Sequence, residues 1–225
     1  MIVLGLTGSI GMGKTVAARN FARLGVPVFE ADAVVHELLG PGGAGVAPVG
    51  EAFSGTVREG AVDRAALGDR VFGDGQALRR LEAIVHPLVA ERRRSFLRAS
   101  AARRRPLVAL DIPLLFETRM ERECDYVAVV SAPAAVQRAR VLARPGMTEA
   151  KLAAILDQQV PDVTKRRRAD FVIPTGGSRT RSLRRIREIV TILGGGRARG
   201  RRPPAIPRRR WARKGRLHAR GRARY

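Results

Sequence analysis

The chain has 225 residues, 45% of them hydrophobic, so it is long enough to bury a substantial core in one domain. Aromatic residues make up only 4%, which predicts an aliphatic core, and the single cysteine, Cys124, excludes an intramolecular disulfide and argues against a cysteine-based metal cluster. The longest apolar runs have only the length of a strand, and the N-terminus lacks the form of a signal peptide. We therefore expect a cytoplasmic protein with no membrane partner.

The net charge of +23 is concentrated near the C-terminal end. Residues 195–225 contain 13 Lys or Arg and no Asp or Glu, and subtracting these from +23 leaves +10 for residues 1–194. This segment has three prolines and little periodic apolar content, so it is predicted to be a disordered tail. It is interpreted either as an arm that contacts nucleic acid or another polyanion, or as a solvated, non-catalytic extension.

The first predicted element is an apolar strand that leads into a glycine-rich turn. Residues 8–15 fit the phosphate-binding loop pattern, with a strand before them and a helix after them. Glycines let the backbone wrap closely around a polyphosphate, and the start of the helix adds its positive dipole end. Lys14 is expected to reach the β and γ phosphates, and Thr15 to bind Mg²⁺. The residues predicted to bind ATP or GTP here are Gly8, Ser9, Ile10, Gly11, Met12, Gly13, Lys14 and Thr15.

A second short strand is predicted at residues 26–29, and it ends at Glu30 and Asp32. Carboxylates that follow a strand lie at the ligand-binding edge of an open α/β sheet. Asp32 is therefore a candidate catalytic carboxylate. It is equally suited to cap a helix over residues 33–39.

A Gly-Pro-Gly-Gly break at residues 40–43 opens a long stretch that is poor in strands. Apolar residues recur there at helical spacing, and the stretch is too long for an ordinary connection between strands. We therefore expect a helical insertion over residues 41–102. His86 and Pro87 are expected at a helix start, where proline fits the first turn, and the lone histidine is open to a structural or a catalytic interpretation.

Three more strands are predicted at residues 107–112, 126–130 and 169–173. Asp111 ends the first of them, where it could hold Mg²⁺ through water or orient a substrate. Further helices are predicted at residues 148–159, 162–168 and 178–193. The alternation of strands and helices predicts an α/β, three-layer P-loop fold with a five-stranded parallel sheet.

Arginines gather before the last predicted strand. Arg138, Arg140 and Arg144 precede the break at Pro145. Because an arginine fork binds phosphate oxygens in bidentate fashion, these residues could close over a triphosphate as a lid, here placed at residues 138–160. They are equally suited to a solvated basic face.

Five blocks of sequence, taken together and in this order, resemble the dephospho-CoA kinase family. They are the phosphate loop, residues 24–36, His86-Pro87, Asp111-Ile112-Pro113-Leu114-Leu115-Phe116-Glu117 and residues 165–173. Many kinases share the phosphate loop, whereas its combination with Glu30-Ala31-Asp32, His-Pro and Pro-Leu-Leu-Phe-Glu is far more specific. The resemblance covers about residues 1–192, and it implies a kinase domain over residues 1–194.

The resemblance implies a nucleoside-monophosphate-kinase-like fold with a helical CoA-binding lobe and a small ATP lid. It implies that ATP, with Mg²⁺, phosphorylates the ribose 3′-hydroxyl of dephospho-CoA in the last step of coenzyme A biosynthesis. By their positions in the family's motifs, the implied catalytic residues are Asp32 as general base, Lys14 and the lid arginine Arg140, with Arg144 close to a second lid arginine. The positions implied to line the acceptor site are His86, Pro113, Leu114 and Glu117.

The chain departs from the family's common residues at Glu30, at Pro145 and at residues 174–177. Two other functions stay open. Another small-molecule kinase would share the loop and the fold but lack the His-Pro and Pro-Leu-Leu-Phe-Glu pairing. A nucleic-acid-binding NTPase is suggested by the net charge, and it would depend on the basic tail.

Overall fold

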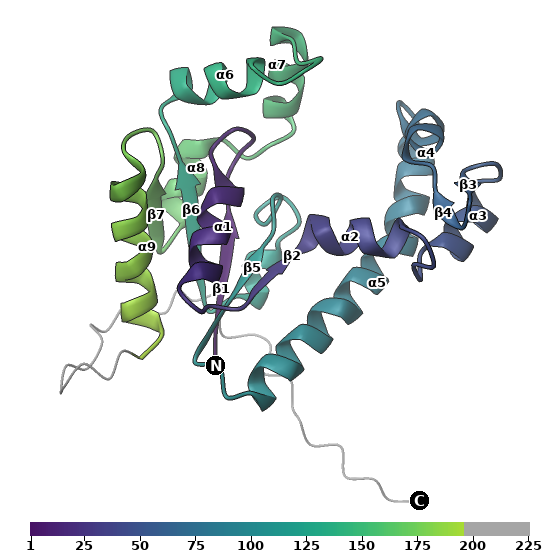
Figure 1. Ribbon diagram of the computed structural model, residues 1–225. Coiled ribbons are helices and arrows are strands. Elements are labelled where there is room, and N and C mark those ends of the chain that lie inside the picture. The colour runs from purple at the N-terminus through teal and green to yellow at the C-terminus, as the bar shows by residue number, and fades with distance from the viewer. Residues whose placement is uncertain (196–225) are drawn as a thin grey trace, which may run out of the picture. The chain divides into compact units, whose positions relative to one another are not determined.

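The structure is a computed structural model, and it describes residues 1–195 (Figure 1). All but the first residue of the predicted basic tail lie outside the described residues. By their internal contacts the described residues divide into two compact units, one made of Met1–Val28 and residues 104–195, the other of Phe29–Arg103. Within residues 1–195, no helix has the length and apolar character that a membrane span requires.

A five-stranded parallel sheet has the strand order β2-β5-β1-β6-β7. Its strands are β1 (Ile2–Thr7), β2 (Val28–Glu30), β5 (Leu107–Asp111), β6 (Tyr126–Ser131) and β7 (Phe171–Pro174). Central β1 pairs in parallel with β5, where Leu6 lies opposite Asp111, and with β6, where Leu6 lies opposite Ala128. The five strands predicted from the sequence are therefore confirmed, with ends that differ by one or two residues.

Helices cover the sheet. One face carries α1 (Lys14–Arg23) and α9 (Arg179–Leu193), which also contact each other (Figure 1). Side chains on alternate strand positions share a face, so Leu4 and Leu6 of β1 pack with Phe21 of α1 and Ile186 of α9. The remaining helices after β5 are the short 3-10 helix at Met120–Glu123, α6 (Ala134–Leu142), α7 (Glu149–Asp157) and α8 (Asp162–Arg168), of which α8 packs on β6.

The second unit is mainly helical. Its elements are α2 (Ala31–Leu39), α3 (Val46–Ala52), the antiparallel hairpin of β3 (Val57–Arg58) and β4 (Ala61–Val62), α4 (Arg64–Val71) and α5 (Gly75–Ala102). The long helix α5 packs against α2, α3 and α4 around a core that includes Val49, Phe53 and Leu67. Asp74 begins α5 by accepting from the amides of Gln76 and Ala77, and these hydrogen bonds lower the pKa of its carboxyl.

The predicted capping role of Asp32 is wrong. α2 begins at Ala31 directly after β2, with Glu30 in the N-cap position, so Asp32 lies inside the first turn. A carboxylate there interacts favourably with the positive end of the helix dipole without being the cap.

The predicted helix start at Pro87 is also wrong, because α5 continues without a break from Gly75 to Ala102 with Pro87 inside it. Proline lacks an amide hydrogen, and its ring crowds the carbonyl four residues earlier, which usually ends or kinks a helix. Packing against three other helices stabilises α5 in spite of this local cost.

We predict that Pro87→Ala raises the free energy of unfolding by about 2 kcal/mol, measured by urea denaturation. Proline is about 3 kcal/mol less favourable than alanine inside a helix, and its stiffening of the unfolded chain offsets part of that. Glu82→Ala, at an exposed position of the same helix, is the control and should change stability little. A loss of stability in Pro87→Ala would contradict the prediction.

Candidate active site

The loop between β1 and α1 has a backbone that only glycine accommodates well. Gly11 and Gly13 have φ angles of +75° and +86°, in the left-handed region. A Cβ atom on Gly8 would lie 2.7 Å from the carbonyl oxygen of Val130. Glycine is therefore favoured at Gly11 and Gly13 by their positive φ angles, and at Gly8 by the close approach of the Val130 carbonyl.

Side chains from outside the loop donate to its carbonyl groups. The three contacts are Gln137 Nε2 to Ile10 O at 2.8 Å, Arg140 Nη1 to Gly11 O at 3.5 Å and Thr175 Oγ1 to Met12 O at 2.6 Å. The first amides of α1, beginning at Lys14, have no carbonyl partner within their helix. Backbone amides and the positive helix end are suited to an anion, and the loop carbonyls are held by other partners.

Lys14 forms an ion pair with Asp111, with 2.7 Å between Nζ and Oδ1. Their side chains are 16% and 5% exposed, so the pair is mostly shielded from water. Parallel pairing of β1 with β5 brings the carboxyl ends of both strands together, and Asp111 thereby reaches the residue that begins α1. Asp111, which ends β5, therefore lies beside the end of the phosphate loop.

The oxygen groups near the start of α1 fit a magnesium ion. Mg²⁺ prefers hard oxygen ligands and usually takes only one or two from the protein when phosphates supply others. The Thr15 hydroxyl and the Asp111 carboxylate are groups of this kind. Within the described part of the chain, no cluster of three or more His, Cys, Asp or Glu could hold a metal ion by itself.

The predicted lid region, residues 138–160, begins within α6 and includes all of α7, and these two helices contact each other. An ion pair between Arg138 and Glu149 joins them. Arg140 donates from Nη2 to Thr175 O at 2.6 Å, so α6 is also connected to the turn after β7. Arg144 is exposed, and its side chain has no hydrogen bond or ion pair within residues 1–195. The structure therefore brings Arg140 to the phosphate loop and leaves Arg144 at the surface.

The loop after β5 contains the three acceptor-site candidates of this unit. Pro113 accepts a hydrogen bond from Thr7 Oγ1 at 2.8 Å, which attaches this loop to the end of β1. Leu114 is 42% exposed, which is unusual for a large apolar side chain next to a buried strand. Glu117 accepts from the Val160 amide at 2.9 Å. The loop is thus anchored at both ends and presents Leu114 to the outside.

Glu117 also pairs with Lys165, with 2.9 Å between Oε1 and Nζ, and the Lys165 side chain is completely buried. Sequence reasoning missed this lysine as a partner. The available signal was spacing, since Asp162, Lys165 and Arg168 lie three residues apart on one face of α8. The other two side chains also have partners: Asp162 accepts a hydrogen bond from Ser131 Oγ at 2.8 Å, and Arg168 forms an ion pair with Glu121 at 2.6 Å.

The two candidates in the helical unit are both exposed, Asp32 in the first turn of α2 and His86 within α5.

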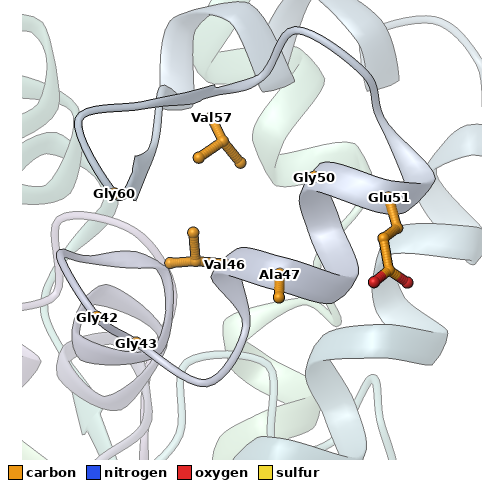
Figure 2. A pocket seen from close by; sticks show the side chains of 8 residues that line it. All are labelled: Gly42, Gly43, Val46, Ala47, Gly50, Glu51, Val57 and Gly60. Atoms are coloured by element: carbon orange, nitrogen blue, oxygen red, sulfur yellow. The ribbon is translucent and has the colours of Figure 1, made fainter.

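This unit also contains a pocket of about 550 Å³, shown in Figure 2. Its lining residues are Gly42, Gly43, Val46, Ala47, Gly50, Glu51, Val57 and Gly60. Walls that are mainly apolar, with one carboxylate, suit an uncharged and largely aliphatic group and disfavour a polyphosphate.

Comparison of the sequence with those of known proteins identifies the family of this chain. The sequence profile described as dephospho-CoA kinase matches residues 2–180. The chain belongs to the dephospho-CoA kinase family. It is therefore a kinase, and its phosphate loop is that of an ATP-using member of this family.

Relatives named dephospho-CoA kinase are similar over most of their length. That of Paramagnetospirillum magneticum is 61% identical over 207 residues, covering 92% of this chain and 95% of the relative. That of Rhodospirillum rubrum is 55% identical over 203 residues, covering 89% and 96%. The crystal structure of a Thermus thermophilus protein, 35% identical, superposes with a TM-score of 0.72 over 84% of this chain and 95% of that one.

We predict that Lys165→Met lowers the free energy of unfolding by about 3 kcal/mol, because it leaves the Glu117 carboxylate without its buried cation. Chemical denaturation measures the loss. Arg166→Met, at the exposed neighbouring position on α8, should cost less than about 0.5 kcal/mol. Equal losses in the two variants would show that the ion pair does not anchor the loop.

Proposed function

We propose that this protein transfers the γ-phosphoryl group of ATP to the ribose 3′-hydroxyl of dephospho-CoA and produces CoA and ADP, the final step of coenzyme A biosynthesis. The observation that carries the proposal is the phosphate loop, in which Lys14 pairs with Asp111 and other side chains hold the loop carbonyls. Membership of the dephospho-CoA kinase family supports the choice of acceptor.

Phosphoryl transfer depends mainly on positioning and on stabilising charge that spreads over the phosphate oxygens. The loop amides and Lys14 would neutralise the β and γ phosphates. Thr15 would hold Mg²⁺, which supplies further neutralisation when bound. Arg140 already lies beside the loop, at 3.5 Å from Gly11 O, and Arg144 would be a second arginine that binds phosphate when the lid closes.

On the acceptor side, Asp32 would accept the proton of the 3′-hydroxyl or orient that hydroxyl for in-line attack. His86, Pro113 and Leu114 would line the acceptor site, the exposed Leu114 by apolar contact. Glu117 would act there by fixing the loop after β5, through its hydrogen bond with the Val160 amide and its ion pair with Lys165.

We further propose that the helical unit binds the acceptor. The arm of dephospho-CoA is neutral and largely aliphatic, and the pocket in Figure 2 has walls of matching character.

An acceptor screen separates this function from that of another small-molecule kinase, since ADP release should depend on dephospho-CoA and not on nucleosides or sugar acids. Truncation after Gly194 tests nucleic-acid dependence, and the truncated chain should retain transfer.

Asp32→Asn should reduce transfer to dephospho-CoA by at least about 100-fold, because it removes the proton acceptor. ATP binding should stay within about twofold, since no phosphate contact is removed. ADP release in a coupled assay measures transfer, and calorimetry measures binding. Asp69→Asn, at an exposed position of α4, is the matched control and should behave as wild type. Undiminished transfer in Asp32→Asn would remove it from the role of base.

Lys14→Ala should weaken ATP binding and transfer, each by about 10- to 100-fold, because it removes a charge-assisted bond and leaves the Asp111 carboxylate unopposed by Lys14. Arg19→Ala changes an exposed cation on the same helix and serves as the control for net charge. If Lys14→Ala and Arg19→Ala bound ATP equally well, the assignment of the phosphate loop would be wrong.

A further inference from the structure

Both backbone polar groups of Ile10, near the tip of the phosphate loop, are held by glutamine side chains. The Ile10 amide donates to Gln159 Oε1 at 3.2 Å. The Ile10 carbonyl accepts from Gln137 Nε2 at 2.8 Å. The amide of Ile10, one of the residues predicted to bind the nucleotide, is therefore already engaged by a side chain.

The two glutamines stand at the two ends of the predicted lid. Gln137 lies within α6, and Gln159 follows the end of α7 at Asp157. Residues 138–158, most of the predicted lid, therefore lie between them in the chain. The chain enters the predicted lid after Gln137 and leaves it shortly after Gln159. Both glutamines hydrogen-bond to Ile10 of the phosphate loop.

Each of these two ends is firmly held. Gln137 is only 7% exposed, and α6 approaches the loop so closely that a Cβ on Gly11 would lie 2.5 Å from Val141 Cγ2. On the other side, Val160 follows Gln159 directly and donates its amide to Glu117. Gln159 is thus positioned by the same carboxylate that the buried Lys165 holds.

We propose that Gln137 and Gln159 are positioning residues that together hold Ile10, and through it set the shape of the phosphate loop and the fixed base about which the lid moves. The two glutamines use opposite halves of their amide groups. Gln159 acts as an acceptor toward N–H, and Gln137 acts as a donor toward C=O. A lid attached in this way changes its cover over the nucleotide without displacing the loop that binds the phosphates.

This difference in polarity provides a matched pair of variants. Gln159→Glu retains an oxygen that accepts from the Ile10 amide, whereas Gln137→Glu cannot donate and places oxygen against oxygen. Each adds one negative charge beside the same loop residue, so repulsion of the nucleotide is similar in both. We expect the Kd for ADP to rise about tenfold more in Gln137→Glu than in Gln159→Glu, since one variant loses its hydrogen bond and the other keeps it.

Gln159→Leu removes the acceptor, and Gln158→Leu makes the same change at the exposed neighbouring position. We expect Gln159→Leu to raise the Kd for ADP and the KM for ATP about tenfold and to lower kcat, with the KM for dephospho-CoA unchanged within about twofold. Gln158→Leu should match wild type in all four quantities. A purely structural role would instead lower the melting temperature of Gln159→Leu without this selective effect on the nucleotide.

The proposal is overturned if the two glutamate variants bind ADP equally, or if Gln159→Leu behaves as Gln158→Leu. If Gln137→Glu melts below the assay temperature, the comparison of Gln159→Glu with Gln159→Leu decides alone, and equal binding in that pair overturns the proposal. It rests on the proposed function for the identity of the donor nucleotide. Calorimetric ADP binding needs no acceptor, so a wild-type protein that failed to phosphorylate dephospho-CoA would contradict the proposed function separately.

Discussion

A phosphate loop can wrap a polyanion only if its backbone carbonyls are kept away from the phosphates, because carbonyl oxygens and phosphate oxygens repel each other. In this protein three side chains meet that constraint, and they come from α6 and from the turn after β7. Two of them, Gln137 and Arg140, belong to α6, the helix in which the predicted lid region begins. The loop that defines the family is therefore shaped by elements more than 100 residues away in the chain.

A second network of contacts is formed by Glu117 of the loop after β5, the buried Lys165 and the Val160 amide. Lys165 is wholly buried, and a buried cation is tolerated only when it is paired. Its partner Glu117 also accepts a hydrogen bond from the Val160 amide, so a single carboxylate connects the loop after β5, α8 and the segment that carries Gln159. Such a network contributes less to net stability than to a unique arrangement of the loops around a site.

Local rules predicted the strands and most helices, because the apolar patterns and turn residues of this chain agree with its fold. They failed at Pro87 and at Asp32. At Pro87, packing of α2, α3 and α4 along α5 outweighs a local preference for a helix start. At Asp32, the strand β2 passes directly into α2 without the intervening residue that a cap at this position would need. The proposed role of Asp32 as base does not depend on capping.

The sequence by itself determined the phosphate loop, the parallel α/β fold and the family, because these depend on residue spacing within short segments and on periodic patterns along the chain. Only the tertiary structure decided that Asp111 pairs with Lys14, that Lys165 pairs with Glu117 and that Gln137 and Gln159 hold Ile10. Each of these contacts joins residues that are distant in the chain. Sheet pairing and helix packing bring them within hydrogen-bonding distance, and no periodicity within a single segment encodes that meeting.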